Sequence, residues 1–96
     1  MNRDLHPTEG ARYLLECSAD DGARATYRAV IYTPTTAHAT TAHVTDDGTS
    51  TLETSDAPAE LVERLAIMVK LIARDAVRRR EDGLGAWPER VLRWRK

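Results

Sequence analysis

The chain has 96 residues, of which 42% are hydrophobic and 30% are charged, and this composition is typical of one folded domain and argues against a disordered chain. Its single cysteine, Cys17, excludes a fold held together by disulfides within the chain. The longest nearly apolar run, Leu65 to Ala73, is about half of a membrane span, and no charged-then-apolar leader precedes the domain. We therefore expect one cytoplasmic domain over 1–96 that has no membrane partner.

The formal net charge of −1 divides unevenly along the chain. Residues 1–56 carry four basic and nine acidic side chains, whereas residues 57–96 carry ten basic and six acidic ones. Two halves of opposite charge attract each other within one fold, and a basic surface also attracts an acidic partner. The sequence leaves both interpretations open.

Residues 1–10 are expected to form an irregular arm, and the chain then alternates between apolar and polar residues. This period of two predicts a strand from Ala11 to Cys17 and a second strand from Arg24 to Thr33. The Asp20-Asp21-Gly22 sequence between them is typical of a tight turn, because aspartate bonds to nearby backbone and glycine accepts positive φ. The first two strands should form an antiparallel hairpin.

A second hairpin is predicted from Ala37 to Thr54. Its strands, Ala37–Thr45 and Thr49–Thr54, flank another Asp-Asp-Gly turn, and nine threonines fall between Thr33 and Thr54. Threonine is common in strands because its branched Cβ packs well on a pleated surface. Residues 11–54 are therefore expected to form an antiparallel meander of three or four strands.

A long helix is predicted over residues 57–82. Asp56 is a suitable N-cap, Pro58 suits the first turn, and Gly83 is placed for a left-handed C-terminal cap. Its apolar arc should cover one face of the sheet. Strand and helix periods together predict one contiguous core, formed by Tyr13, Leu15, Tyr27, Ile31, Leu65, Val69 and Ile72.

A short last element is expected over residues 87–95. Trp87, Val91 and Trp94 would share one face of a helix, whereas Leu92 and Trp94, two residues apart, would equally suit a strand. We prefer the helix. The predicted fold is α+β in two layers: an antiparallel meander of three or four strands, one long helix, and a short C-terminal helix.

Ile67 and Leu71 interrupt the otherwise polar face of the long helix. They are four residues apart and therefore adjacent on the helix surface. The cover for this pair is either the C-terminal segment or a second copy of the chain. We accordingly predict an interaction patch that consists of Ile67, Leu71, Trp87, Val91 and Trp94.

No residue pattern predicts a catalytic, metal or cofactor site. His38 and His43 are five residues apart on one strand, so their side chains should lie on opposite sheet faces. Acidic neighbours would raise the pKa of Cys17, so we expect a structural thiol. The paired aspartates are each followed by glycine, so turn chemistry explains them. We therefore expect a non-enzymatic protein without a bound metal or cofactor.

A basic cluster near the C-terminus is the strongest functional signal. Arginines with an interleaved tryptophan attract phosphate backbones and unstacked bases, although cations at a helix C-terminus are also favourable for the helix dipole. The cluster consists of Arg78, Arg79, Arg80, Arg90, Arg93, Arg95 and Lys96.

The most favoured function is an interaction or adaptor domain that forms a homodimer or binds another protein. The first alternative is binding of a nucleic acid or another acidic partner through the basic cluster. The second is small-molecule binding between sheet and helix. The order of the elements is shared by too many small domains to decide among them.

Overall fold

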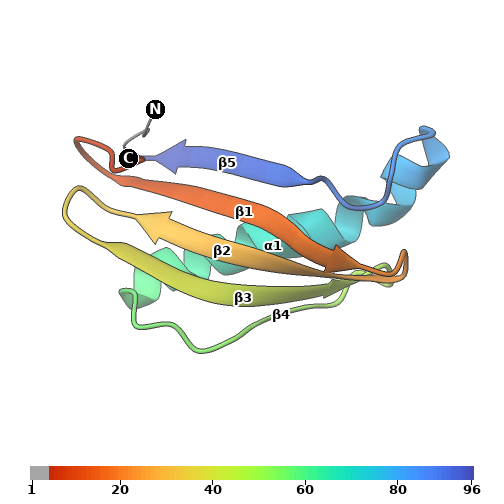
Figure 1. Ribbon diagram of the computed structural model, residues 1–96, viewed down its shortest axis with the longest axis horizontal. Coiled ribbons are helices and arrows are strands. Elements are labelled where there is room, and N and C mark those ends of the chain that lie inside the picture. The colour runs from red at the N-terminus through yellow and green to blue at the C-terminus, as the bar shows by residue number, and fades with distance from the viewer. Residues whose placement is uncertain (1–4) are drawn as a thin grey trace.

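The computed structural model describes residues 5–96 and shows an antiparallel five-stranded sheet with one helix across one face (Figure 1). The elements are β1 (Ala11–Asp20), β2 (Arg24–Tyr32), β3 (Ala37–Thr45), β4 (Ser50–Leu52), α1 (Ala59–Glu81) and β5 (Arg90–Arg95). The order across the sheet is β4-β3-β2-β1-β5, so β5 returns along the free side of β1. The α+β prediction with an antiparallel sheet is confirmed. The predicted three or four strands and two helices are wrong in number.

The predicted C-terminal helix is replaced by strand β5. Val91 lies opposite Leu15 and Arg93 opposite Tyr13, and the Cys17 amide extends the ladder by donating to the Glu89 carbonyl at 2.8 Å. Without β5, one side of the ten-residue strand β1 would present a row of unpaired backbone groups. Pairing with this long edge therefore outweighs the local helical pattern of residues 87–95.

Helix α1 begins and ends close to the predicted positions, but its N-terminus differs in detail. Pro58 is the N-cap, without a side-chain hydrogen bond, and the predicted cap Asp56 instead accepts a hydrogen bond from His38 at 2.9 Å. At the other end Gly83 has a φ of 78°, and the Leu84 amide donates to the Arg79 carbonyl at 2.8 Å. This is the predicted left-handed cap, which satisfies carbonyls left free at the end of the helix.

The core lies between the sheet and α1. All seven residues predicted for it belong to one buried cluster, in which Tyr13, Leu15, Tyr27, Ile31 and Leu65 have no exposed surface. Strand alternation and helical periodicity select these positions independently, because only side chains on the facing sides of the two layers leave water together. The core prediction is confirmed.

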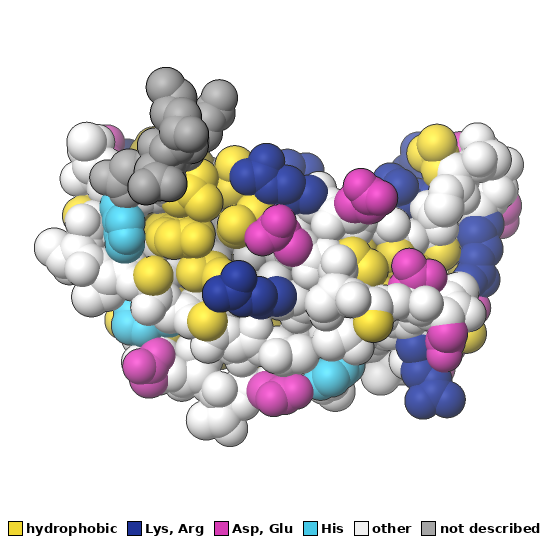
Figure 2. All heavy atoms as spheres, viewed as in Figure 1, with side chains coloured by type: hydrophobic (Ala, Val, Ile, Leu, Met, Phe, Trp, Pro, Cys, Tyr) yellow, Lys and Arg dark blue, Asp and Glu magenta, His cyan; other side chains and the backbone are white. Residues whose placement is uncertain are grey.

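Within residues 5–96, no helix covers the opposite face of the sheet, and Figure 2 shows hydrophobic side chains gathered on part of this face. Residues 5–10 of the arm lie at one end of it, where the Trp94 indole donates to the Glu9 carbonyl at 3.1 Å. Gly10 turns the arm into β1 with a φ of 72°, and a Cβ there would approach the Arg95 carbonyl oxygen to 2.2 Å. Only glycine fits this position without rearrangement.

Candidate interaction surface

Ile67 and Leu71 lie on the side of α1 that faces away from the sheet. Ile67 is 60% exposed and Leu71 is 49% exposed. The buried side of the helix carries Leu65, Val69, Ile72, Ala73 and Ala76. Side chains four positions apart are neighbours on a helix, so the pair forms one continuous apolar patch. Exposed apolar residues that stand alone need no explanation, but adjacent ones mark a surface suited to a partner.

Charged residues continue this stripe towards both ends of α1. Glu60 and Glu63 lie towards its N-terminus, Arg74 and Arg78 lie towards its C-terminus, and all four are exposed. With about 3.6 residues per turn, positions 60, 67, 71 and 78 fall along one line of the helix surface. We call the six residues Glu60, Glu63, Ile67, Leu71, Arg74 and Arg78 the outer stripe. It is acidic at one end, apolar in the middle and basic at the other.

The tryptophans predicted to cover Ile67 and Leu71 lie elsewhere. Trp87 is only 8% exposed, belongs to the core cluster, and donates from its indole nitrogen to the Gly22 carbonyl at 3.1 Å. Trp94 pairs with Arg12 on the open face of the sheet, away from α1. The segment that contains the tryptophans therefore leaves the apolar part of the outer stripe uncovered.

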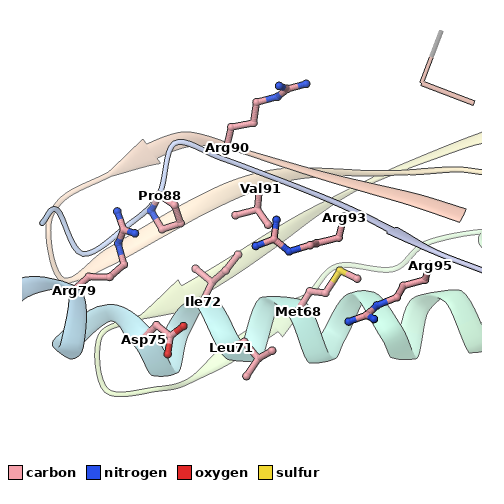
Figure 3. Close-up of a pocket in the computed structure, with 10 residues that line it drawn as sticks. All are labelled: Met68, Leu71, Ile72, Asp75, Arg79, Pro88, Arg90, Val91, Arg93 and Arg95. Atoms are coloured by element: carbon pink, nitrogen blue, oxygen red, sulfur yellow. The ribbon is translucent and has the colours of Figure 1, made fainter. Parts of the chain in front are cut away.

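Val91 occupies a third location, in a groove between α1 and β5. This groove encloses about 350 Å³, and its apolar surface comes from Met68, Leu71, Ile72, Pro88 and Val91. Figure 3 shows Arg93 and Arg95 reaching from β5 towards the helix, and Arg79 at the opposite end. The structure thus brings Val91 near Leu71, whereas Trp87 belongs to the core and Trp94 lies on the open face of the sheet.

The predicted basic cluster is divided in the same way. Arg79, Arg90, Arg93 and Arg95 line the groove, and the end of the Arg90 side chain points away from it in Figure 3. Arg80 contacts the Asp46 carboxylate at 2.8 Å and donates to the Gly22 carbonyl. Arg78 belongs to the outer stripe, and Lys96 lies 3.8 Å from the Glu9 carboxylate. Four of the seven cations therefore line one cavity.

The sequence pattern does not predict this groove, because the groove exists only when residues 90–95 form a strand. One available signal is the alternation of Val91, Arg93 and Arg95, which places these three side chains on one face of an extended chain. Val91 lies opposite Leu15 of β1, and Arg93 lies opposite Tyr13. Leu15 and Tyr13 belong to the core, so this face of β5 is turned towards α1.

The two strand histidines lie on opposite faces of the sheet, as predicted. His38 lies opposite Ile31 on the helix side, and His43 lies opposite Thr26 on the open side. His38 contacts the Asp56 carboxylate at 2.9 Å, and His43 contacts the Glu53 carboxylate at 2.7 Å. Among residues 5–96, no group of three or more histidine, cysteine or acidic side chains is placed to hold one metal ion.

Cys17 is partly buried and packs against the core. Burial, followed by the negative charge of Asp20, raises the pKa of its thiol, so the nucleophilic thiolate is disfavoured. Its cross-strand neighbour Tyr27 donates from its hydroxyl to the Pro88 carbonyl at 2.5 Å, and burial raises the pKa of this hydroxyl. Both groups fit a structural role.

The paired aspartates build the two hairpin turns. Asp21 accepts hydrogen bonds from the Ala23 and Arg24 amides at 3.1 and 2.8 Å, and Asp47 accepts one from the Thr49 amide at 2.9 Å. Hydrogen bonds from the Thr45 hydroxyl and from Thr49 lower the pKa of Asp47 to about 2. The turn chemistry predicted from the Asp-Asp-Gly sequences is therefore present.

Searches of protein-family models, curated proteins and solved structures find no match to this chain. Within residues 5–96, no helix combines the length and the apolar character needed to cross a lipid bilayer.

Proposed function

We propose that this chain is a non-catalytic interaction domain of the cytoplasm that self-associates through the outer stripe of α1. The observation that carries the proposal is the exposure of Ile67 and Leu71, 60% and 49%, on the side of the helix opposite the core. The free thiol of Cys17 is consistent with the reducing conditions of the cytoplasm.

The charge pattern of the outer stripe is self-complementary when two copies of α1 pack antiparallel. A twofold axis between positions 67 and 71 places Ile67 against the Leu71 of the second copy, because such an interface is reciprocal. The same axis brings Glu60 towards the partner's Arg78, and Glu63 towards the partner's Arg74. A parallel pair would instead place Glu60 against its own copy, which is repulsive.

The expected interaction energies predict a weak dimer. Burying an exposed aliphatic side chain contributes about 1.5–3 kcal/mol, and about half of each side chain is already covered, so four of them contribute on the order of 3–6 kcal/mol. Exposed ion pairs add roughly 0.2–1 kcal/mol each, while association costs at least about 4 kcal/mol. The balance favours association by at most about 6 kcal/mol, so we expect a dissociation constant of tens of micromolar or weaker.

Sedimentation equilibrium over roughly 10 µM to 2 mM protein tests the proposal, because so weak a dimer dissociates within this range. The wild type should shift from monomer to dimer with concentration. Ile67→Asp should remain a folded monomer at every concentration. Val77→Asp is the matched control, because Val77 is an exposed aliphatic residue of α1 that lies outside the outer stripe.

A wild type that stays monomeric throughout would contradict self-association. Equal loss of the dimer in Val77→Asp and Ile67→Asp would show that the outer stripe is not the interface. Circular dichroism of both variants should confirm that each remains folded.

A further inference from the structure

Strand β5 is an edge strand of the sheet, and its inner side pairs with β1 along all six residues. Helix α1 packs over β3 and β4, at the far side of the sheet from β5. The groove that contains Val91 therefore lies between β5 and α1, on the helix side of the sheet. We propose that β5 accepts an extended acidic segment of another protein as a sixth strand, with alternate side chains entering this groove.

The backbone of β5 provides the first requirement for strand addition. In the order β4-β3-β2-β1-β5, no described strand lies beyond β5. An edge strand offers backbone donors and acceptors on its outer side, and an added peptide gains affinity by pairing with them. A six-residue strand is long enough for a peptide of typical strand length.

The charge of the groove indicates an acidic occupant. Arg79, Arg93 and Arg95 line it, and none of them lies within 4.0 Å of a carboxylate in residues 5–96. Asp75 is the one acidic residue among those that line the cavity. Guanidinium groups bind carboxylates through directional, charge-assisted hydrogen bonds, so carboxylates entering between Arg93 and Arg95 would be well matched.

The apolar lining of the groove defines the remaining chemistry. Met68, Ile72 and Val91 provide an apolar surface between the arginines, and Met68 and Val91 are only partly buried. Side chains of an added strand alternate between faces, so every second residue would point towards α1. The occupant should therefore carry both acidic and aliphatic residues at alternate positions.

A second copy of β5 is a poor occupant of the same edge. Two copies of Arg90–Arg95 in antiparallel register would bring like charges opposite one another, which destabilises strand pairing. A nucleic acid is also disfavoured, because Trp87 is buried and Trp94 lies on the other face of the sheet. The groove between α1 and β5 therefore has no tryptophan available for base stacking.

The groove and the outer stripe share Leu71, but Ile67 belongs to the outer stripe alone. The outer stripe points away from the sheet, whereas the groove lies along the β5 edge (Figure 3). Peptide binding at β5 therefore does not depend on self-association through Ile67, and Ile67→Asp should retain it.

Fluorescence anisotropy with a labelled peptide of about ten residues tests the inference. In this peptide, the odd positions alternate between glutamate and valine, and every even position is threonine. We expect saturable binding that weakens roughly two- to fivefold in Arg93→Gln or Arg95→Gln and about tenfold in the double variant. Arg28→Gln is the matched control, because it removes the same charge from the open face of β2.

Two further measurements distinguish strand addition from general attraction. A peptide with lysine in place of glutamate should not bind, and the glutamate peptide should slow hydrogen exchange of β5 amides that do not pair with β1. Equal weakening by Arg28→Gln, or no change in β5 exchange, would overturn the proposal. A single-stranded oligonucleotide that binds more tightly and depends on Arg93 and Arg95 would likewise overturn it.

Discussion

The hydroxyl of Tyr27 on β2 donates a hydrogen bond to the carbonyl of Pro88, 61 residues further along the chain, at 2.5 Å. Pro88 lies in the segment that leads into β5, so this bond connects the interior of the sheet to the strand that completes it. Together with the hydrogen bond from Trp87 to Gly22, it holds the beginning of the last strand in place.

Replacing Tyr27 with phenylalanine should lower the free energy of unfolding by about 1 kcal/mol, the usual contribution of one hydrogen bond. The stability is lost because the Pro88 carbonyl would no longer accept a hydrogen bond from residue 27. Urea unfolding followed by circular dichroism measures the difference, and an unchanged midpoint would show that the bond contributes nothing.

Tyr13→Phe is the matched comparison and should behave differently. The Tyr13 hydroxyl is buried without a hydrogen-bond partner among the described residues. Removing a buried group without a partner relieves a desolvation penalty, so the variant should be as stable as the wild type or more stable. Destabilisation equal to that of Tyr27→Phe would reveal a partner for this hydroxyl.

Leu65→Ala should lower the free energy of unfolding by about 2–5 kcal/mol, because Leu65 is fully buried and its truncation leaves a cavity. Leu71→Ala, at low protein concentration, should change it by less than about 0.5 kcal/mol, since Leu71 is half exposed. The two leucines lie on the same helix, so comparing their urea midpoints separates core from surface. Similar losses at both positions would contradict the assignment of the outer stripe as a surface.

Acid should weaken the fold partly through Asp47. The folded pKa of this carboxylate is lowered from 3.8 to about 2, so its stabilising contribution is present above about pH 4 and is lost as the pH falls towards 2. Asp47→Asn keeps a hydrogen-bond acceptor but no charge, so its urea midpoint should fall less steeply over this range. Parallel curves for the variant and the wild type would contradict this role.

The core could be predicted from sequence because its determinants are local periodicities. Alternation selected Tyr13 and Tyr27, the helical period selected Leu65 and Val69, and the bounds of β3, Ala37–Thr45, follow from its flanking turns. Each of these patterns lies within a few residues of chain, and each was confirmed.

The last strand could not be predicted in the same way, since residues 87–95 fit both periods. Their structure depends on β1, which lies more than seventy residues earlier and offers an unpaired edge. The same difference applies to the candidate site. The exposure of Ile67 and Leu71 could be predicted, because it follows from helical spacing alone. The groove beside Arg93 and Arg95 could not be predicted, because it depends on β5.

The most direct test of antiparallel self-association is a charge exchange at the two ends of the outer stripe. Glu60 and Arg78 are about 27 Å apart along one helix, so they cannot contact each other within a chain. Glu60→Arg and Arg78→Glu should each weaken the dimer roughly two- to tenfold by sedimentation equilibrium, and the double variant should restore the wild-type dissociation constant. Additive weakening in the double variant, or a wild type that remains monomeric, would contradict the account.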